Sequence, residues 1–313
     1  MAEAVKTTKM NDEDYPGLYQ CADAISNHAQ KVYLILQRTY LVSLISGSIL
    51  GSFTAFGSAV IKVWLYTAMA SIFTLGLLVL WIIRARQDDK AWFDGRAIAE
   101  SIKTATWRFM MNAQPFQVND TMEDRFIDEL REVRRARSSF EKHLAAVINP
   151  HTSAITDFMR KIRLASHDER KVFYIESRVR DQKSWYSNKA KTNAKMGARW
   201  FWTTVALQAV AVVIAIVQAV AGGLGFNIVP VLATCAAAVT AWSQMKRYDE
   251  LAQSYALAAQ ELEELESIAN NLKNDNDFPQ LVKQVEEAIS REHTMWCARR
   301  DVRLSGHSPD RKR

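Results

Sequence analysis

Two long apolar runs stand out in the pattern of hydrophobic and polar residues along this chain. The first extends from Leu41 to Ile83, and Lys62 is its only charged residue. A helix needs about 20 apolar residues to cross the hydrocarbon core of a bilayer, which is about 30 Å thick. The run is too long for one helix and predicts two transmembrane spans, at about 41–61 and 63–83, with Lys62 at the turn of a hairpin.

The second run repeats this plan. It extends from Phe201 to Met245 and contains no Asp, Glu, Lys or Arg. A glycine-rich segment over 222–227 divides it, which predicts two more spans at about 200–221 and 228–245. The sequence therefore predicts an all-α membrane protein with two transmembrane helical hairpins, four spans in total, and long cytoplasmic helices outside them.

The charges beside the two runs predict how the hairpins are oriented. Short flanks rich in Lys and Arg stay in the cytoplasm. Such residues gather at the open ends of both hairpins, at Lys31, Arg38, Arg84, Arg86, Lys90, Lys189, Lys191, Lys195, Arg199, Lys246 and Arg247. We therefore expect a multi-pass protein of the inner membrane with both termini cytoplasmic. Lys62 would lie at the outer surface, where it can snorkel to the headgroups or serve in gating or ion binding.

Apolar residues keep helical spacing outside the predicted spans. In the first half they predict helices over 14–38, 84–111 and 120–148. The dipeptide Asn149–Pro150 disfavours helix continuation. We place the domain boundary there, which gives an N-terminal two-transmembrane domain over 1–150 and a C-terminal two-transmembrane domain over 151–313.

The second half has the stronger seam of apolar residues. A long helix is predicted from Asp168 towards the second hairpin, with no helix breaker before the third span. After the fourth span, apolar residues alternate three and four apart, as in coiled coils. The candidate association seam consists of Leu251, Tyr255, Leu262, Leu265 and Leu272, together with Ala258 and Ala269. We expect the cytoplasmic helices to form a bundle or coiled coil and the chain to form a homo-oligomer.

Small and polar residues within the spans are the candidate functional residues. In the first span they are Ser43, Gly47, Gly51, Thr54 and Ser58. Gly47 and Gly51 match the GxxxG pattern that lets two helix backbones approach closely in lipid. The third span carries Gln208 and Gln218, whose amides are costly in hydrocarbon without partners. For both sets, helix packing and a polar pore face remain open interpretations.

Composition narrows the function classes. The chain has 313 residues and a net charge of +6, and much of the positive charge lies beside the predicted spans, where anionic lipid attracts it. We therefore expect a lipid bilayer and no nucleic acid as its partner. Cys21, Cys235 and Cys297 have neither metal-ligand nor redox spacing, which predicts free thiols in a reducing compartment. The polar first residues predict no cleavable signal peptide.

The sequence contains no catalytic motif that we recognise. It has no GxxxxGK[ST] phosphate loop and no HExxH. His167 to Glu169 is typical of a helix N-terminus rather than a metal site. Arg131, Arg134 and Arg135 form a basic cluster, which is either a solvated helix face or a grip for a phosphate-bearing ligand or anionic lipid. We expect no catalytic residue, metal or cofactor, and so no enzyme.

Short motifs around both hairpins resemble a known family. The motifs of the first half are Asp14-Tyr15-Pro16, Leu18-Tyr19, Ala22-Asp23, Ser26 and the segment from Arg96 to Arg108. They resemble the third type of SLATT domain, the SMODS- and SLOG-associating two-transmembrane effector domains. The second half resembles the first type at Glu169-Arg170, Tyr174-Ile175, Arg178, Asp181-Gln182, Trp185-Tyr186, Ala241-Trp242 and Tyr255.

This resemblance implies a function. It implies a membrane effector of a bacterial conflict or antiphage defence system that forms a pore or disrupts the membrane when a nucleotide signal or partner sensor activates it. It also implies a nucleotide-sensing or nucleotidyltransferase partner encoded nearby, and it brings no catalytic residues. A constitutive small ion channel and a non-conducting membrane scaffold remain as alternatives.

Overall fold

A computed structural model describes residues 10–55, 58–117, 120–136, 140, 153–221, 227–272 and 274–290. Every regular element in these ranges is a helix, as the sequence predicts. The chain divides into two compact units. We call residues 30–88 and 190–253 the hairpin unit, and the remaining three segments, 1–29, 89–189 and 254–313, the core unit.

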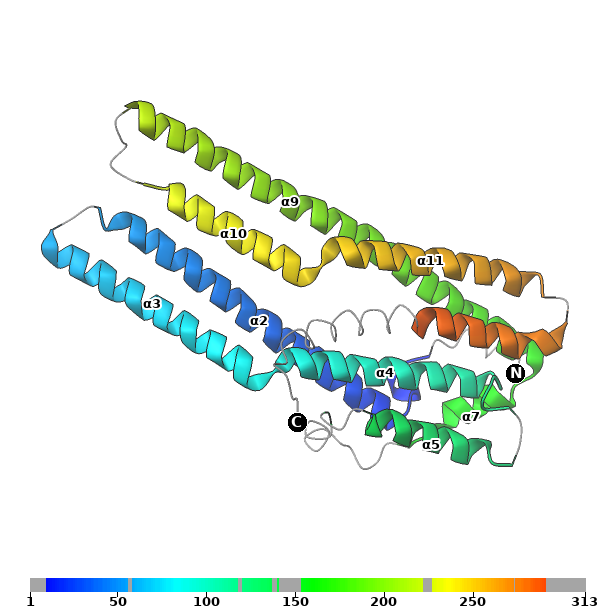
Figure 1. The fold of residues 1–313 in the computed structure, drawn as a ribbon. Coiled ribbons are helices and arrows are strands. Elements are labelled where there is room, and N and C mark those ends of the chain that lie inside the picture. Colours follow the sequence, from blue (N-terminus) through cyan, green and yellow to red (C-terminus); the bar gives the residue numbers. More distant parts are fainter. Residues whose placement is uncertain are drawn as a thin grey trace, which may run out of the picture. The chain divides into compact units, whose positions relative to one another are not determined.

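The long helices of the hairpin unit run side by side (Figure 1). They are most of α2 (Gly17–Phe53), α3 (Ala59–Arg86), most of α9 (Asp181–Ala221) and α10 (Val229–Lys246). A hydrogen bond of 3.2 Å between Thr234 Oγ1 and Ser48 Oγ joins α10 to α2. Both hairpins of the sequence prediction thus contribute to one compact unit.

Many large apolar side chains of this unit are exposed. Trp64, Leu77 and Val213 are among the exposed large side chains. In the most apolar 18 residues of the helical stretch His167–Val220, 0% of the residues are buried. In the corresponding 18 residues of Gly17–Phe53 and of Ala59–Met110, 11% are buried. An apolar surface of this extent is characteristic of contact with lipid rather than water.

Three helical stretches of the described chain are long and apolar enough to cross a membrane. They are Gly17–Phe53, Ala59–Met110 and His167–Val220. The membrane character predicted from the sequence is therefore supported. The short helix α10 is not among the three, so the fourth span remains a prediction.

The turn of the first hairpin does not lie at Lys62, so that prediction is wrong. Helix α2 ends at Phe53, and α3 begins at Ala59. Lys62 lies in the first turn of α3, where its backbone N–H donates to the carbonyl oxygen of Ser58 at 3.1 Å. Ser58 has the extended backbone and the residue type of a helix N-cap, which is a stronger boundary signal than the midpoint of an apolar run.

The helix predicted over 84–111 also begins later than expected. Helix α3 continues to Arg86, Gln87 adopts a left-handed backbone with φ of 51°, and α4 (Asp88–Met110) follows. No glycine or proline announces this break. In contrast, α8 (His167–Tyr174), a π-helical segment (Ile175–Arg180) and α9 follow one another directly, which confirms the predicted continuity into the third span.

The core unit contains the hydrophobic core. It includes the start of α2, α4, α5 (Met122–Arg135), α7 (Asp157–Leu164), α8, most of α11 (Tyr248–Asn270) and a helix over 278–290. Short 3₁₀ helices occur at Asp12–Asp14 and Asp275–Asp277. The apolar stripe expected on α4 is buried, at Ile98, Ile102, Ala105 and Phe109. Residues three and four apart share one helix face, so this spacing brings them into a common core.

The compact units are composed differently from the predicted domains 1–150 and 151–313. Each unit takes segments from both halves of the sequence. The predicted boundary at Asn149–Pro150 lies outside the described residues, as do most of the predicted turn over 222–227 and the end of the helix expected over 120–148.

Candidate functional site

The small-residue stripe of the first span lies where α2 meets α3. A Cβ atom added to Gly47 would lie 2.5 Å from the ring of Phe73, and one added to Gly76 would lie 2.6 Å from Ser43 Oγ. A side chain at either glycine would therefore meet Phe73 or Ser43 of the opposite helix, and that neighbouring side chain would have to shift. The structure thus places Ser43 and Gly47 at a helix contact, the arrangement that small residues permit in membranes.

The hydroxyl groups of this region bond to their own helix. Ser43 Oγ donates to the carbonyl oxygen of Tyr40, and Thr54 Oγ1 donates to that of Gly51, both at 2.7 Å. Thr54 and Ser58 lie in the connection between α2 and α3 rather than within the first helix. Hydroxyls satisfied in this way have less hydrogen-bonding capacity left for water in a pore.

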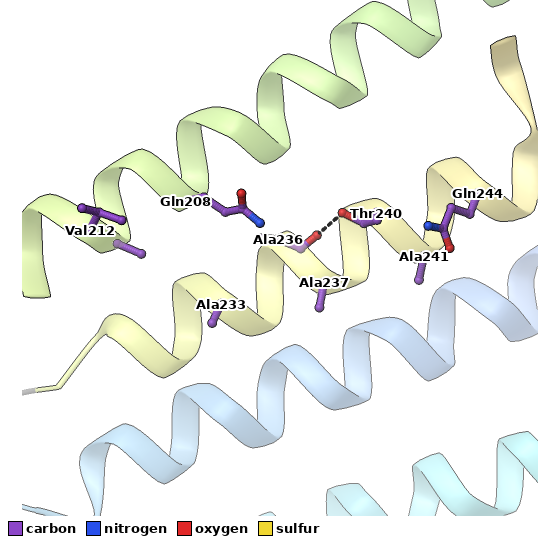
Figure 2. A pocket seen from close by; sticks show the side chains of 9 residues that line it. Gln208, Val212, Ala233, Ala236, Ala237, Thr240, Ala241 and Gln244 are labelled. Atoms are coloured by element: carbon purple, nitrogen blue, oxygen red, sulfur yellow. Dashed lines mark hydrogen bonds between the residues drawn. The ribbon is translucent and has the colours of Figure 1, made fainter.

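A groove lies between α9 and α10 (Figure 2). Its volume is about 610 Å³, and its apolar walls are formed mostly by small side chains, at Ala211, Val212, Ala233, Ala236, Ala237 and Ala241. Three polar residues also line it, Gln208, Thr240 and Gln244. The groove therefore combines little side-chain bulk with a strip of hydrogen-bonding groups.

Gln208 is the central polar residue of this groove. Figure 2 shows its side chain extending from α9 towards α10, and the residue is exposed. Thr240 Oγ1 donates to the carbonyl oxygen of Ala236 at 2.9 Å. Gln218, the other predicted glutamine, is half-buried further along α9 and does not line the groove. The structure therefore does not bring the two glutamines together in one site.

Sequence reasoning missed Thr240 and Gln244 as groove residues. They lie four apart on α10, beside the alanine face formed by Ala233, Ala237 and Ala241. A polar stripe next to a small-residue stripe at helical spacing is the signal that could have identified them.

Two cations lie over one tryptophan where the hairpin unit reaches its predicted inner boundary. Arg38 Cζ is 4.9 Å and Lys246 Nζ is 5.9 Å from the ring centroid of Trp242. Cations at these distances are attracted to the face of an indole ring. This contact joins α2 to α10 at a level where aromatic and basic side chains commonly meet lipid headgroups.

The core unit contains a buried ion pair. Arg178, in the π-helical segment, donates from Nε to Glu286 Oε1 at 2.9 Å and from Nη2 to Oε2 at 2.7 Å. Tyr174 donates its hydroxyl to the same Oε1 at 3.0 Å. The side chains of Arg178 and Glu286 are 1% and 0% exposed. Arg178 Cζ also lies 5.7 Å from the ring centroid of Trp107.

Electrostatics reinforces this network. Burial by itself would lower the pKa of Arg178, but the neighbouring Glu286 carboxylate raises it above its ordinary value. Burial and the same carboxylate raise the pKa of Tyr174 well above the ordinary value. Arg178 therefore stays charged and the phenol of Tyr174 stays protonated. The sequence marked Tyr174 and Arg178 only as family motifs, because Glu286 is 108 residues from Arg178 in the chain.

The candidate association seam is largely occupied within the chain itself. Leu262, Leu265, Ala258 and Ala269 are buried in the core of the core unit. The ring centroid of Tyr255 lies 5.4 Å from that of Trp185 and 5.7 Å from that of Tyr186. Leu251 and Leu272 are half-buried. Burial of this seam therefore does not require a second copy of the chain.

The basic cluster is exposed on α5. Arg131, Arg134 and Arg135 all have exposed side chains, and Arg131 pairs with Asp128 at 2.7 Å. In the described part of the chain, no group of three or more His, Cys, Asp or Glu residues could hold a metal ion. The Nε2 atom of His167 lies 3.3 Å from Asp275 Oδ1. Cys21 and Cys235 are free thiols, and Cys297 lies outside the described residues.

Comparison with known proteins identifies both halves of the chain. Residues 16–171 match the model of SMODS and SLOG-associating 2TM effector domain 3, and residues 174–296 match that of SMODS and SLOG-associating 2TM effector domain 1. Curated proteins and solved structures gave no significant match. The order of the two matches is the order predicted from the motifs. The chain therefore belongs to the SLATT family of two-transmembrane effector domains, with a type 3 domain followed by a type 1 domain.

Proposed function

We propose that this chain permeabilises the bacterial inner membrane when a nucleotide signal or a partner sensor activates it, as an effector of antiphage defence. Membership of the SLATT family supports the broader role of a membrane effector in conflict systems. The observation that supports pore formation is the groove between α9 and α10. Its lining is mostly apolar and includes three polar residues, Gln208, Thr240 and Gln244.

The physical reason is that lipid cannot pair with these groups. An amide in hydrocarbon is stabilised only when water or another polar group bonds to it. The groove presents Gln208 beside small side chains, so another helix or a column of water can approach it. Several copies assembled around such strips would enclose a polar path. None of the described residues that line the groove is charged, so the path would select weakly between ions.

The proposal includes a closed resting state. A path that was always open would dissipate the membrane potential. The arginine and lysine residues beside the hairpins favour a cytoplasmic location for the core unit. In that location the core unit is accessible to a cytoplasmic nucleotide or sensor, which can shift the balance between closed and open states.

A non-conducting scaffold is the second candidate. It is favoured by the contact between α2 and α3, where Ser43 and Gly47 serve close packing. In a scaffold, Gln208 would bond to a neighbouring helix without enclosing water. The two candidates differ in one observable property, which is leakage through the membrane.

Leakage from liposomes tests the proposal. Purified protein is reconstituted with a trapped dye and a potassium gradient, and cyclic oligonucleotides or a co-purified sensor are added. We expect leakage by the wild type and at least about tenfold less by Gln208→Leu/Gln218→Leu, because leucine does not solvate water or ions. The matched control is Val210→Leu/Val220→Leu, which changes two exposed valines on the same helix at the same separation.

The outcomes separate the candidates. Equal leakage by the glutamine variant and the wild type would show that the glutamines are packing residues only. An activated wild type that is inserted and oligomeric but never leaks would replace the pore with the scaffold.

A further inference from the structure

The π-helical segment Ile175–Arg180 lies within one continuous helical stretch. Helix α8 precedes it and α9, which carries Gln208, follows it without a break. π-helical segments are rare in proteins, occur mostly as single turns inside α-helices, and are frequent at functional sites. Here the segment also contains Arg178, the cation of the buried ion pair.

A buried ion pair such as Arg178–Glu286 usually stabilises a fold no more than apolar residues would. Removing two charges from water is costly, and apolar residues of similar size often stabilise a core equally well or better. Among the described residues, no group accepts a hydrogen bond from the buried Nη1 of Arg178. A rare backbone conformation and an incompletely satisfied charge therefore occur together in six residues.

Glu286 bonds to two residues of this helical stretch. Its carboxylate accepts from Tyr174, just before the π-helical turn, and from Arg178 within it. Both donors, Tyr174 and Arg178, lie in the continuous helical stretch from α8 to α9. The acceptor, Glu286, lies in a separate helix over 278–290. Conversion of the π-helical turn to α-helix would shift the register by one residue. In an α-helix one residue corresponds to about 100° of rotation.

We propose that Glu286 is a latch: it holds the segment Ile175–Arg180 in its π-helical register, and its release from Arg178 lets the segment become α-helical and turns α9 about its own axis. This inference rests on the proposed function, because the rotation would re-orient Gln208 between a closed and an open arrangement. An activator that moves the helix over 278–290 away from Arg178 would act by this route.

Hydrogen–deuterium exchange of the full-length protein in nanodiscs tests the latch without relying on leakage. Glu286→Gln leaves Arg178 buried without a counter-charge, so we expect the amides of Ile175–Arg180 to exchange at least about tenfold faster, selectively. Tyr174→Phe keeps the ion pair and removes one hydrogen bond, so exchange should rise less. The matched apolar variant, Tyr174→Phe/Arg178→Met/Glu286→Leu, removes the latch without leaving an unpaired charge at this site, so the same amides should also exchange faster than in the wild type. Wild-type exchange in this variant would show that Glu286→Gln acts only through its uncompensated charge, which overturns the latch.

Leakage without an activator forms the second arm. We expect both Glu286→Gln and the apolar variant to leak, because each releases the segment from the latch. Exchange that is unchanged at Ile175–Arg180 in both Tyr174→Phe and Glu286→Gln, or raised evenly through the core unit, overturns the latch. If Glu286→Gln does not fold, the Tyr174→Phe result alone decides. Selective exchange without leakage in any variant would instead keep the latch and reject the proposed function.

Discussion

At the scale of single residues, buried arginines organise the core unit. Arg163 donates to the carbonyl oxygens of Phe109 and Phe116, the latter at 2.9 Å, and its Cζ lies 4.5 Å from the ring centroid of Phe109. Burial, with a contribution from Arg170, lowers the pKa of Arg163 to about 10. This arginine therefore pairs with backbone carbonyls and an aromatic face, and it anchors the connection that follows α4.

Replacing Arg163 should destabilise the protein more than replacing a nearby exposed arginine. Arg163→Met removes the side-chain donor from two buried carbonyl groups, of which that of Phe109 keeps the N–H of Asn112, so we expect the free energy of unfolding to fall by about 2–4 kcal/mol. The control Arg160→Met removes an exposed pair with Glu123 at 3.2 Å and should cost less than about 1 kcal/mol. Denaturant unfolding in detergent measures both. Equal losses in the two variants would contradict the anchoring role.

Residue types alone predict only part of this chemistry. Gln208 stands out because an amide in an apolar run has no alternative to a polar partner. Arg163 and Arg178 do not stand out, because an arginine between helices is usually solvated. Their partners come from the distant segments 109–116 and 278–290, and one sequence without its fold does not reveal such pairs.

At the scale of helices, the apolar residues of α11 stabilise the chain's own core. Leu262 and Leu265 are 1% and 9% exposed, whereas Leu257 on the same helix is 59% exposed. Leu262→Glu/Leu265→Glu would bury two carboxylates, so we expect loss of cooperative folding. Leu257→Glu is the control and should melt like the wild type. Circular dichroism and limited proteolysis measure the effect. A folded double variant that has lost only its oligomeric state would show instead that the seam joins copies.

Helix existence was easier to predict than helix boundaries. The spacing of apolar residues is repeated over many turns, so α4, α9 and α11 were recognised, as was the continuity from α8 into α9. Boundaries depend on one or two residues. The break at Gln87 has no glycine or proline, so the sequence does not predict the end of α3 correctly. Lys62 follows the N-cap Ser58 by one turn, so the sequence does not predict the start of α3 correctly either. The π-helical segment has no sequence signal that we recognise.

At the scale of the whole molecule, we predict that both termini and the region near residue 150 lie in the cytoplasm. Tags at residue 1, near residue 150 and at residue 313 should be protected from an external protease in intact cells, because the Lys and Arg flanks retain these regions in the cytoplasm. A tag beside Ser58, in the connection between α2 and α3, should be cleaved. This site replaces Lys62, which lies within α3. An accessible tag near residue 150 would contradict the predicted orientation of the first hairpin, and an accessible tag at residue 313 with a protected one near residue 150 would show that α10 does not complete a fourth span.

Electrical recording across a planar bilayer measures permeation most directly. Oligomeric protein is inserted, current is recorded at fixed voltage, and the activating nucleotide or sensor is then added. We predict no current before addition and discrete, weakly selective conductance steps after it. The steps should be strongly reduced in Gln208→Leu/Gln218→Leu and retained in Val210→Leu/Val220→Leu. A wild type that is inserted, oligomeric and bound to its activator, yet passes no current, would contradict permeation as the function of this chain.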